Sequence, residues 1–404
     1  MKKVTFCVIE GKSFAFYGGI LVSGFFILLG LFAAYNMEHH GHIITGMNNQ
    51  IVWGLPHVFA IFLILAASGV LNVASISSVF RKMFYNPLAR LSVLLAITLL
   101  IGGLSVLVLD LGRPDRIIIA MTSYNFKSIF AWNIMLYNGF LLVCVVYLWF
   151  MMQRSMQRYY PTAGLIAFTW RLILTTGTGS IFGFLVAREA YQTAIMAPLF
   201  IALSLSLGLA IFLLVLLIDC WETNCSLGDG ILRRPKKLLG ILIAGVFYFV
   251  LVYHLTHLYF TGRHGVEYFI LAGGGIYTVL FWVGYMLLGT VFPILLLYHE
   301  RFTNSRTSVA LAALLTIVGG ISLLYVIIIG GQAYPLEIFP GKEIISSSLM
   351  SSTTAYSYSP SIWEIMLGIS GIAIASLLTV MAVRILPFMP RSLADTDIDE
   401  AFKG

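Results

Sequence analysis

Long uninterrupted apolar segments are the feature of this sequence that most restricts its fold. A search for stretches of about 20 apolar residues, the length of helix that crosses a bilayer, finds ten of them. They cover residues 14–35, 53–79, 91–111, 129–152, 162–187, 193–219, 238–260, 269–298, 308–330 and 362–386. Lipid offers no hydrogen-bond partner to an open strand, so each segment is predicted to be a helix. The chain is therefore predicted to be an all-α integral membrane protein with about ten transmembrane helices.

The composition excludes a soluble protein. Only 10% of the 404 residues are charged and 59% are hydrophobic, whereas soluble domains carry about 25% charged residues. A water-soluble core would leave too much apolar surface exposed. The net charge of +7 would suggest nucleic-acid binding in a soluble protein, but in a membrane protein it marks the cytoplasmic loops. We therefore expect the lipid bilayer, and not nucleic acid, as a partner.

Lys and Arg residues are distributed unevenly between the two alternating sets of loops. The set that contains both termini carries most of them, including the cluster from Arg233 to Lys237. Loops of this kind stay in the cytoplasm, so both termini are predicted to be cytoplasmic. As far as Lys12 the start is too polar for a cleaved signal peptide. The expected location is the cytoplasmic (inner) cell membrane, with multiple passes.

Ionisable residues collect at the outer ends of the predicted helices. His57 lies about four residues inside the second segment, roughly 6 Å below its outer end. A titratable group within a span is costly and is a functional candidate by default. Asp110 lies in the last turn of the third segment, and Arg113 follows the segment. This pair fits either proton transfer or a structural ion pair. Glu364 opens the tenth segment directly after Trp363.

Metal and haem sites are not favoured by the remaining candidates. His254 and His257 lie three residues apart near the outer end of the seventh segment, and Glu267 opens the eighth. A b-type haem needs two facing histidines at matched depth, which this spacing does not supply. The cysteines do not form a CxxC pair, which argues against an iron–sulfur cluster; they are Cys7, Cys144, Cys220 and Cys225. We expect no haem, iron–sulfur cluster or metal ion in this protein.

Three parts of the sequence resemble the NrfD/PsrC family, the membrane quinone-reactive subunits of polysulfide reductase, hydrogenase and related complexes. They are WGLPH at 53–57, LDLGRPDR at 109–116 and the ending at 360–387, which opens with PSIWE and closes with AVRILP. The resemblance extends over all ten segments. Within the ten-helix branch the sequence is most similar to DsrP, the membrane subunit that accompanies dissimilatory sulfite reductase.

This resemblance implies an architecture and a set of partners. The second to fifth segments (53–187) would form one four-helix bundle and the sixth to ninth (193–330) another, flanked by the first segment and the last (362–386). A pocket for menaquinone or ubiquinone would lie near the outer face of the first bundle. A ferredoxin-like iron–sulfur subunit would dock above it on the extracytoplasmic side, with further redox subunits such as a multihaem cytochrome.

The resemblance also places the quinone contacts. The histidine that contacts quinone in the family falls on His57, and polar positions that open the third helix of the bundle fall on Trp132 and Asn133. The tyrosine of the family pocket is absent, and Thr178 lies on the helix that would carry it, beside three similar residues: Thr175, Thr176 and Ser180.

The residue chemistry is consistent with this assignment. A quinone exchanges two electrons and two protons, and an imidazole with an ordinary pKa near 6.5 suits proton exchange. Asp110 could pass the proton outward, with Arg113 keeping it ionised and Glu364 as a further proton-transfer candidate. The inner half of the spans offers neutral groups such as Tyr137 and Asn138. Proton exchange is therefore predicted on the outer side.

Two other classes of protein remain open. A secondary transporter usually carries charges at the middle of the membrane or helices broken by Gly or Pro. Gly177, Gly179 and Gly183 are the only hint of this, and close helix packing explains them equally well. A subunit of a haem-b quinol oxidase is the third interpretation, which an absorption spectrum of the purified protein would test.

Overall fold

The computed structural model describes residues 6–8, 13–223, 225–300, 302, 305–335, 357–390 and 392–394. Within these residues, 10 helices are long and apolar enough to cross a membrane, which confirms the predicted all-α membrane architecture. In chain order they are α1 (Phe14–His40), α2 with α3 (Leu55–Val70 and Asn72–Ser78), α4 (Asn86–Leu109), α6 (Ile129–Met152), α7 (Tyr160–Gly183), α8 (Met196–Glu222), α9 (Asp229–Tyr259), α11 with η7 and α12 (Ile276–Val279, Leu280–Val291 and Phe292–Tyr298), α13 with η8 and α14 (Arg306–Tyr325, Val326–Gly330 and Gly331–Ala333), and α15 (Ile362–Ile385).

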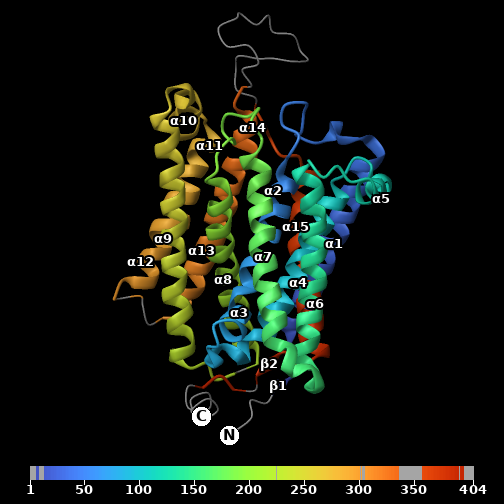
Figure 1. The fold of residues 1–404 in the computed structure, drawn as a ribbon, viewed down its shortest axis with the longest axis vertical. Coiled ribbons are helices and arrows are strands. Elements are labelled where there is room, and N and C mark those ends of the chain that lie inside the picture. Colours follow the sequence, from blue (N-terminus) through green and yellow to red (C-terminus); the bar gives the residue numbers. More distant parts are fainter. Residues whose placement is uncertain are drawn as a thin grey trace, which may run out of the picture.

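Short elements lie at the two ends of these helices (Figure 1). Strands β1 (Phe6–Cys7) and β2 (Met389–Pro390) pair antiparallel at one end, here called the β end. The opposite end, called the loop end, carries α5 (Ile117–Thr122) and α10 (His264–Tyr268). The remaining short helices are η1 (His42–Ile44), η2 (Met83–Tyr85), η3 (Pro114–Arg116), η4 (Arg154–Tyr159), η5 (Thr261–Arg263) and η6 (Phe269–Gly273). The loop end corresponds to the predicted outer side.

The eighth span differs from its prediction. The apolar pattern predicts one helix over 269–298, but η6 ends at Gly273 and α11 begins at Ile276. Gly275 has a φ of 58°, in the left-handed region that glycine adopts without the steric cost of a Cβ atom. The break falls on three consecutive glycines, Gly273 to Gly275, but hydropathy averaged over a window of about 20 residues does not register it, because the residues on both sides are apolar.

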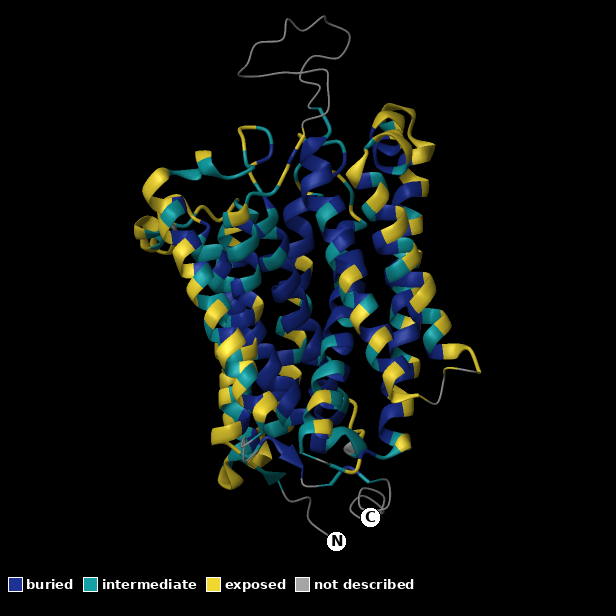
Figure 2. Ribbon diagram, turned by 180° about the vertical axis from the view of Figure 1, so that it is seen from behind, coloured by how far each residue is buried: buried dark blue, intermediate teal, exposed yellow. Residues whose placement is uncertain are grey.

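Helix α2 lies at the centre of the molecule and α1 at its edge. Burial covers 83% of the most apolar window of the second span and only 11% of that of the first. Figure 2 shows the exposed residues on the outward sides of the peripheral helices. Helix α2 contacts α4 and α7, and also α8, α13 and α15. It therefore contacts helices of both predicted four-helix bundles, and the division into these bundles stays a prediction.

The contact between α2 and α8 depends on two glycines. A Cβ atom added at Gly69 would lie 1.6 Å from the carbonyl oxygen of Ser204, and one added at Gly208 would lie 2.1 Å from the carbonyl carbon of Gly69. Small residues of this kind let the backbones of membrane helices approach closely. These two glycines therefore allow the close contact between α2 and α8.

Candidate functional site

A histidine and an aspartate from two antiparallel helices meet at the loop end. Helix α2 begins there and α4 ends there, so His57 in the first turn of α2 faces Asp110, the residue that follows α4. The distance from His57 Nδ1 to Asp110 Oδ2 is 2.8 Å. The Asp110 side chain is 1% exposed, whereas a quarter of the His57 side chain is accessible. The sequence singles out both residues, and the structure brings them together.

A second imidazole completes this cluster. His42 in η1 donates from Nε2 to the carbonyl oxygen of Asp110 at 3.0 Å, and the same atom lies 3.8 Å from Asp110 Oδ1. Burial by itself would raise the pKa of Asp110, but its contacts with His42 and His57 outweigh burial and hold that pKa below the ordinary value. The contact with the Asp110 carboxylate raises the pKa of His42, against the opposing effect of burial. Asp110 is therefore an ionised carboxylate between two imidazoles.

Arg113 does not take the place that the sequence suggested for it. Its side chain is exposed, and the ion pairs of Asp110 in the described part of the protein are with His42 and His57. Arg113 is exposed to solvent, whereas Asp110 is buried beside His42 of η1. Histidines, not arginine, keep the carboxylate ionised.

Aromatic side chains lie beside His57: Trp53, Phe182 and Tyr191, here called the aromatic wall. The Trp53 ring stacks near the His57 imidazole, with centroids 6.3 Å apart and 29° between the planes. Phe182 packs edge-on against Trp53 at 5.7 Å, and Tyr191 lies 6.5 Å away on a nearly parallel plane. On sequence alone a tryptophan at a helix end is more typical of the interfacial belt. The only local hint of another role for Trp53 is its position four residues before His57.

The backbone of this wall is fixed by Gln332, which sequence analysis did not identify. Its Oε1 accepts hydrogen bonds from the backbone N–H groups of Val52 and Trp53 at 2.9 and 3.0 Å. Its Nε2 donates to the carbonyl oxygen of Trp53 at 3.0 Å. Arg188 donates to the carbonyl oxygen of Gln332 at 2.9 Å. Gln332 of the ninth span therefore fixes the backbone at the start of the second span through hydrogen bonds.

Glu364 is buried in a hydrogen-bond network at the loop end. The side chain is fully buried, and its Oε2 accepts from the backbone N–H groups of Gly46 and Ser361, each at 2.8 Å. Tyr358 donates to Glu364 Oε1 at 2.6 Å and accepts from the N–H of Leu55 at 2.7 Å. The carboxylate therefore links the loop after η1 to the start of α15 and, through Tyr358, to the start of α2. Its predicted part in proton transfer stays a prediction.

Three residues on α6 and α7 are predicted to contact quinone: Trp132, Asn133 and Thr178. The structure places Trp132 apart from the other two. Asn133 is buried and donates to the carbonyl oxygen of Gly177 at 3.1 Å, while Thr178 lies 3.5 Å from Asn133 Oδ1 and 3.2 Å from the hydroxyl of Tyr137. This network joins α6 to α7. Trp132 is 45% exposed and donates to the carbonyl oxygen of Phe126. The structure therefore places Trp53, and not Trp132, on the ring of His57.

A buried arginine lies deeper in the same group of helices. Arg171, midway along α7, is 2% exposed and donates from Nη2 to Asn72 Oδ1 at 3.2 Å. Its guanidinium also lies over the Phe168 ring, 4.8 Å from the centroid. Cations inside a span are rare and usually functional. The signal for it in the sequence is an arginine within an apolar segment.

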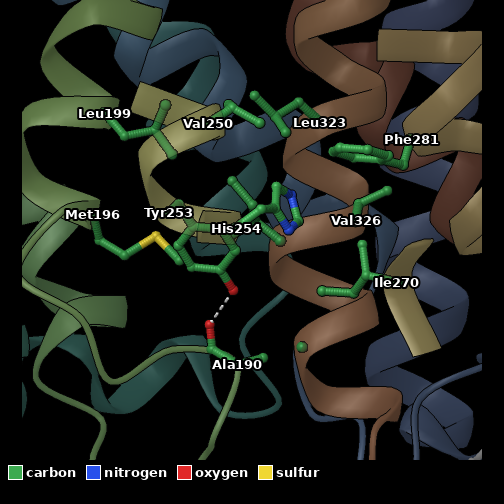
Figure 3. Close-up of a pocket in the computed structure, with 12 residues that line it drawn as sticks. Ala190, Met196, Leu199, Val250, Tyr253, His254, Ile270, Phe281, Leu323 and Val326 are labelled. Atoms are coloured by element: carbon green, nitrogen blue, oxygen red, sulfur yellow. Dashed lines mark hydrogen bonds between the residues drawn. The ribbon is translucent and has the colours of Figure 1, made fainter. Parts of the chain in front are cut away.

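A second cluster of two histidines and one carboxylate lies among α9, α10 and η7. His254 Nδ1 lies 2.7 Å from Glu267 Oε2, and His257 Nδ1 lies 3.1 Å from Oε1. Burial would raise the pKa of Glu267, but the two imidazoles outweigh burial and lower that pKa. Figure 3 shows the His254 ring beside a cavity of about 20 Å³, with Tyr253 donating to the carbonyl oxygen of Ala190.

The size of this cavity argues against a binding site for an organic molecule at the His254 cluster. A volume of about 20 Å³ is close to the roughly 10–15 Å³ that one water molecule needs, so no organic ring fits beside His254. Within the residues that the structure describes, no group of three or more His, Cys, Asp or Glu residues is arranged to hold a metal ion. A quarter of the His57 side chain is accessible, against 11% of His254 and 2% of His257, so the more open His57 cluster is the stronger candidate for a binding site.

Comparison with known proteins gives the same family as the sequence motifs. The family described as "Polysulphide reductase, NrfD" matches residues 43–335. The protein is 26% identical over 399 residues to the "Hdr-like menaquinol oxidoreductase integral membrane subunit" of Archaeoglobus fulgidus, a match over 98% of this sequence and 100% of that one. It is 30% identical to a putative dimethyl sulfoxide reductase membrane subunit of Halobacterium salinarum, over 92% and 91% of the two sequences. It is 26% identical to a polysulfide reductase chain of Wolinella succinogenes, over 71% and 96%. With its ten apolar helices, this multi-pass membrane protein belongs to the polysulphide reductase NrfD family.

Proposed function

We propose that this protein is the quinone-reactive membrane subunit of a respiratory redox complex. In this role it exchanges electrons between the quinone pool and an iron–sulfur partner on the outer side. The observation that carries the proposal is the His57–Asp110 pair at the loop end, with an aromatic wall beside an accessible imidazole. The names of two relatives, one from a menaquinol oxidoreductase and one from polysulfide reductase, support it, and the first favours menaquinone over ubiquinone as the substrate.

The geometry of the pair suits proton transfer from a quinol. With Asp110 ionised beside Nδ1, the neutral imidazole of His57 keeps its proton on Nδ1 and leaves Nε2 as a base. Oxidation of a quinol releases two protons and two electrons. His57 Nε2 accepts one proton at a time from a quinol hydroxyl, Asp110 stabilises the imidazolium that forms, and both electrons pass to a redox centre of the partner. The reverse sequence would serve quinone reduction.

The identity of the complex is a finer proposal. A sulfur-metabolism complex of the DsrP type, with an iron–sulfur subunit and a multihaem cytochrome, is the assembly that the sequence motifs favour. Among the relatives, the names refer to menaquinol, dimethyl sulfoxide, selenate and polysulfide, so terminal substrates vary within the family. Purification of the intact complex and identification of its subunits tests this proposal.

The side of proton exchange gives one testable prediction. Asp110 lies at the loop end, whereas Tyr137 is hydrogen-bonded to Thr178 inside the helices, and Asn138 is exposed on the outer surface of α6. Quinol oxidation in vesicles with a pH dye on each side should acidify the loop-end side. Asp110→Asn should slow this release and Tyr137→Phe should not. Proton release at the β end that is abolished by Tyr137→Phe and unaffected by Asp110→Asn would show an inward path instead.

A second prediction concerns the partner surface. The segment from Arg113 to Lys127 is largely exposed and carries the apolar side chains of Ile118 and Ile119 on α5, a mixture that suits protein contact. The guanidinium of Arg263 is instead engaged with Gln192. The outer loop 331–361 is the remaining part of the predicted surface. Its residues 336–356, including Phe339, lie outside the described residues, and Tyr334 packs against the Phe269 ring.

Cross-linking of the intact complex tests this surface. Photo-reactive groups placed at Lys127 and Ile118 should attach to the iron–sulfur subunit, because both side chains stand out from the loop end. Groups at Arg233 and Lys237 near the β end serve as the matched control. Cross-links to that subunit only from the control positions would reverse the proposed orientation.

A further inference from the structure

An apolar groove lies between α6 and α7 near the β end, far along the helices from the His57 cluster. Its volume is about 490 Å³, within the range of roughly 300–1,000 Å³ typical of small-molecule sites. The lining side chains are almost all apolar, and those that define its shape are Leu142, Val146, Trp149, Phe150, Tyr159 and Ala163.

The groove results from how the two helices meet. Toward the loop end they are held together by Trp170, whose Nε1 donates to the carbonyl oxygen of Leu136 at 2.9 Å and whose ring lies against Gly139. Closer to the β end, Gly164 on α7 sits against Ser78 of α3, which draws α7 toward the centre. The small side chain of Ala163 then leaves space beside α6, and η4 closes the end of the groove.

The length of the groove matches one leaflet of a bilayer. From Leu142 to the end of α6 at Met152 the helix rises by about 15 Å, half of the roughly 30 Å hydrocarbon core. Trp149 is half exposed and packs with Phe150, which in turn contacts Tyr159. Aromatic residues of this kind mark the level of the headgroups. A transmembrane helix of a partner subunit would need a groove across both leaflets, so this shorter groove fits a lipid better than such a helix.

Two positive charges lie on η4, the helix that supplies Met156 and Tyr159 to the lining of the groove. Arg154 and Arg158 are exposed on η4, on either side of the lining residue Met156. Arg158 stacks on the ring of Tyr159, with its guanidinium carbon 4.6 Å from the centroid. In the part of the protein that the structure describes, no carboxylate forms an ion pair with either arginine. Arginine beside an apolar surface suits a phosphate at the membrane interface.

We propose that this groove binds one anionic phospholipid from the leaflet at the β end. An acyl chain lies between α6 and α7, and the phosphate is held by Arg154 and Arg158. The occupant is distinct from the proposed quinone, whose contacts lie at the other end of the helices. Occupation of the groove would fill the gap between α6 and α7, the helices that also carry Asn133 and Thr178.

Lipid retention by the purified complex tests this site. The wild-type complex, delipidated and titrated with phosphatidylglycerol, should bind one molecule at the groove of each protomer when measured by native mass spectrometry. Arg154→Gln together with Arg158→Gln should weaken this binding roughly thirtyfold, since each cation near the surface contributes to anionic-lipid binding. Val146→Trp, which fills the groove from its lipid-exposed side, should abolish it. Arg233→Gln with Lys237→Gln removes the same charge at the same end and should leave it unchanged.

Further probes distinguish the source of the phosphate group. Phosphatidylcholine should bind weakly, and inorganic phosphate should not displace phosphatidylglycerol, if acyl chain and charge are both required. Equal retention of phosphatidylglycerol in all variants would overturn the proposal, as would equal binding of phosphatidylcholine. So would a partner subunit that cross-links to Leu142 and Ile166 and keeps lipid out. Quinol oxidation should persist in the variants, so failure of the lipid site would not affect the proposed function.

Discussion

His57→Ala should lower quinol-dependent reduction of the partner's redox centre by a factor of about 10²–10⁴, the usual contribution of a positioned acid–base group. The substitution removes the only imidazole that contacts both the Asp110 carboxylate and the Trp53 ring in the described structure. A quinol bound there would lose the base that receives its proton. Stopped-flow reduction of the intact complex by a soluble menaquinol analogue measures the effect directly.

Two controls separate chemistry from assembly. His40 is exposed at the same end of the molecule, so His40→Ala should keep the wild-type rate. His57→Gln preserves hydrogen bonding but cannot take up a proton near neutral pH, and it should be almost as slow as His57→Ala. Co-purification of all subunits must be unchanged in each variant. A wild-type rate in an assembled His57→Ala complex would remove His57 from the proposed site.

Gly69→Val should prevent accumulation of the folded protein. The added Cβ atom would lie 1.6 Å from the carbonyl oxygen of Ser204. Because the backbone fixes the position of Cβ and the atoms it meets are backbone atoms of α8, no rotamer avoids the clash. The two helices must separate, at a cost of about 3 kcal/mol or more. Because α2 contacts α4, α7, α8, α13 and α15, the loss extends through the molecule. Fluorescence-detected size-exclusion chromatography and thermal unfolding in detergent measure the result.

The matched control is a glycine on the lipid-facing helix. A Cβ atom at Gly19 of α1 meets nothing within 4 Å, so Gly19→Val should leave both the yield and the unfolding temperature close to those of the wild type. Gly208→Val, on the other side of the crossing, should behave like Gly69→Val. If Gly69→Val folds with wild-type stability, the close contact between α2 and α8 is wrong.

Local sequence information was sufficient for the spans and for part of the site. Each transmembrane helix satisfies its own backbone hydrogen bonds within one segment, so apolar length alone predicts it. His57 and Asp110 also stand out locally, because an ionisable side chain within an apolar segment is costly and is visible without knowledge of its neighbours. The motifs around these residues also led to the correct family.

Only the tertiary structure decided how these residues are held. The N–H groups of Val52 and Trp53 find their acceptor in Gln332, about 280 residues away, and Gly46 finds its own in Glu364, 318 residues away. Two tryptophans, Trp53 and Trp132, look alike in the sequence, but only the packing of α2 against its neighbours puts Trp53 on the His57 ring. Likewise, Arg113 is the basic residue closest to Asp110 in the sequence, but the fold places His42 of η1, and not Arg113, beside the Asp110 carboxylate. Hydropathy records the solvent that each segment prefers and carries no information on which helices become neighbours, so the partners of a buried polar group are determined by the fold.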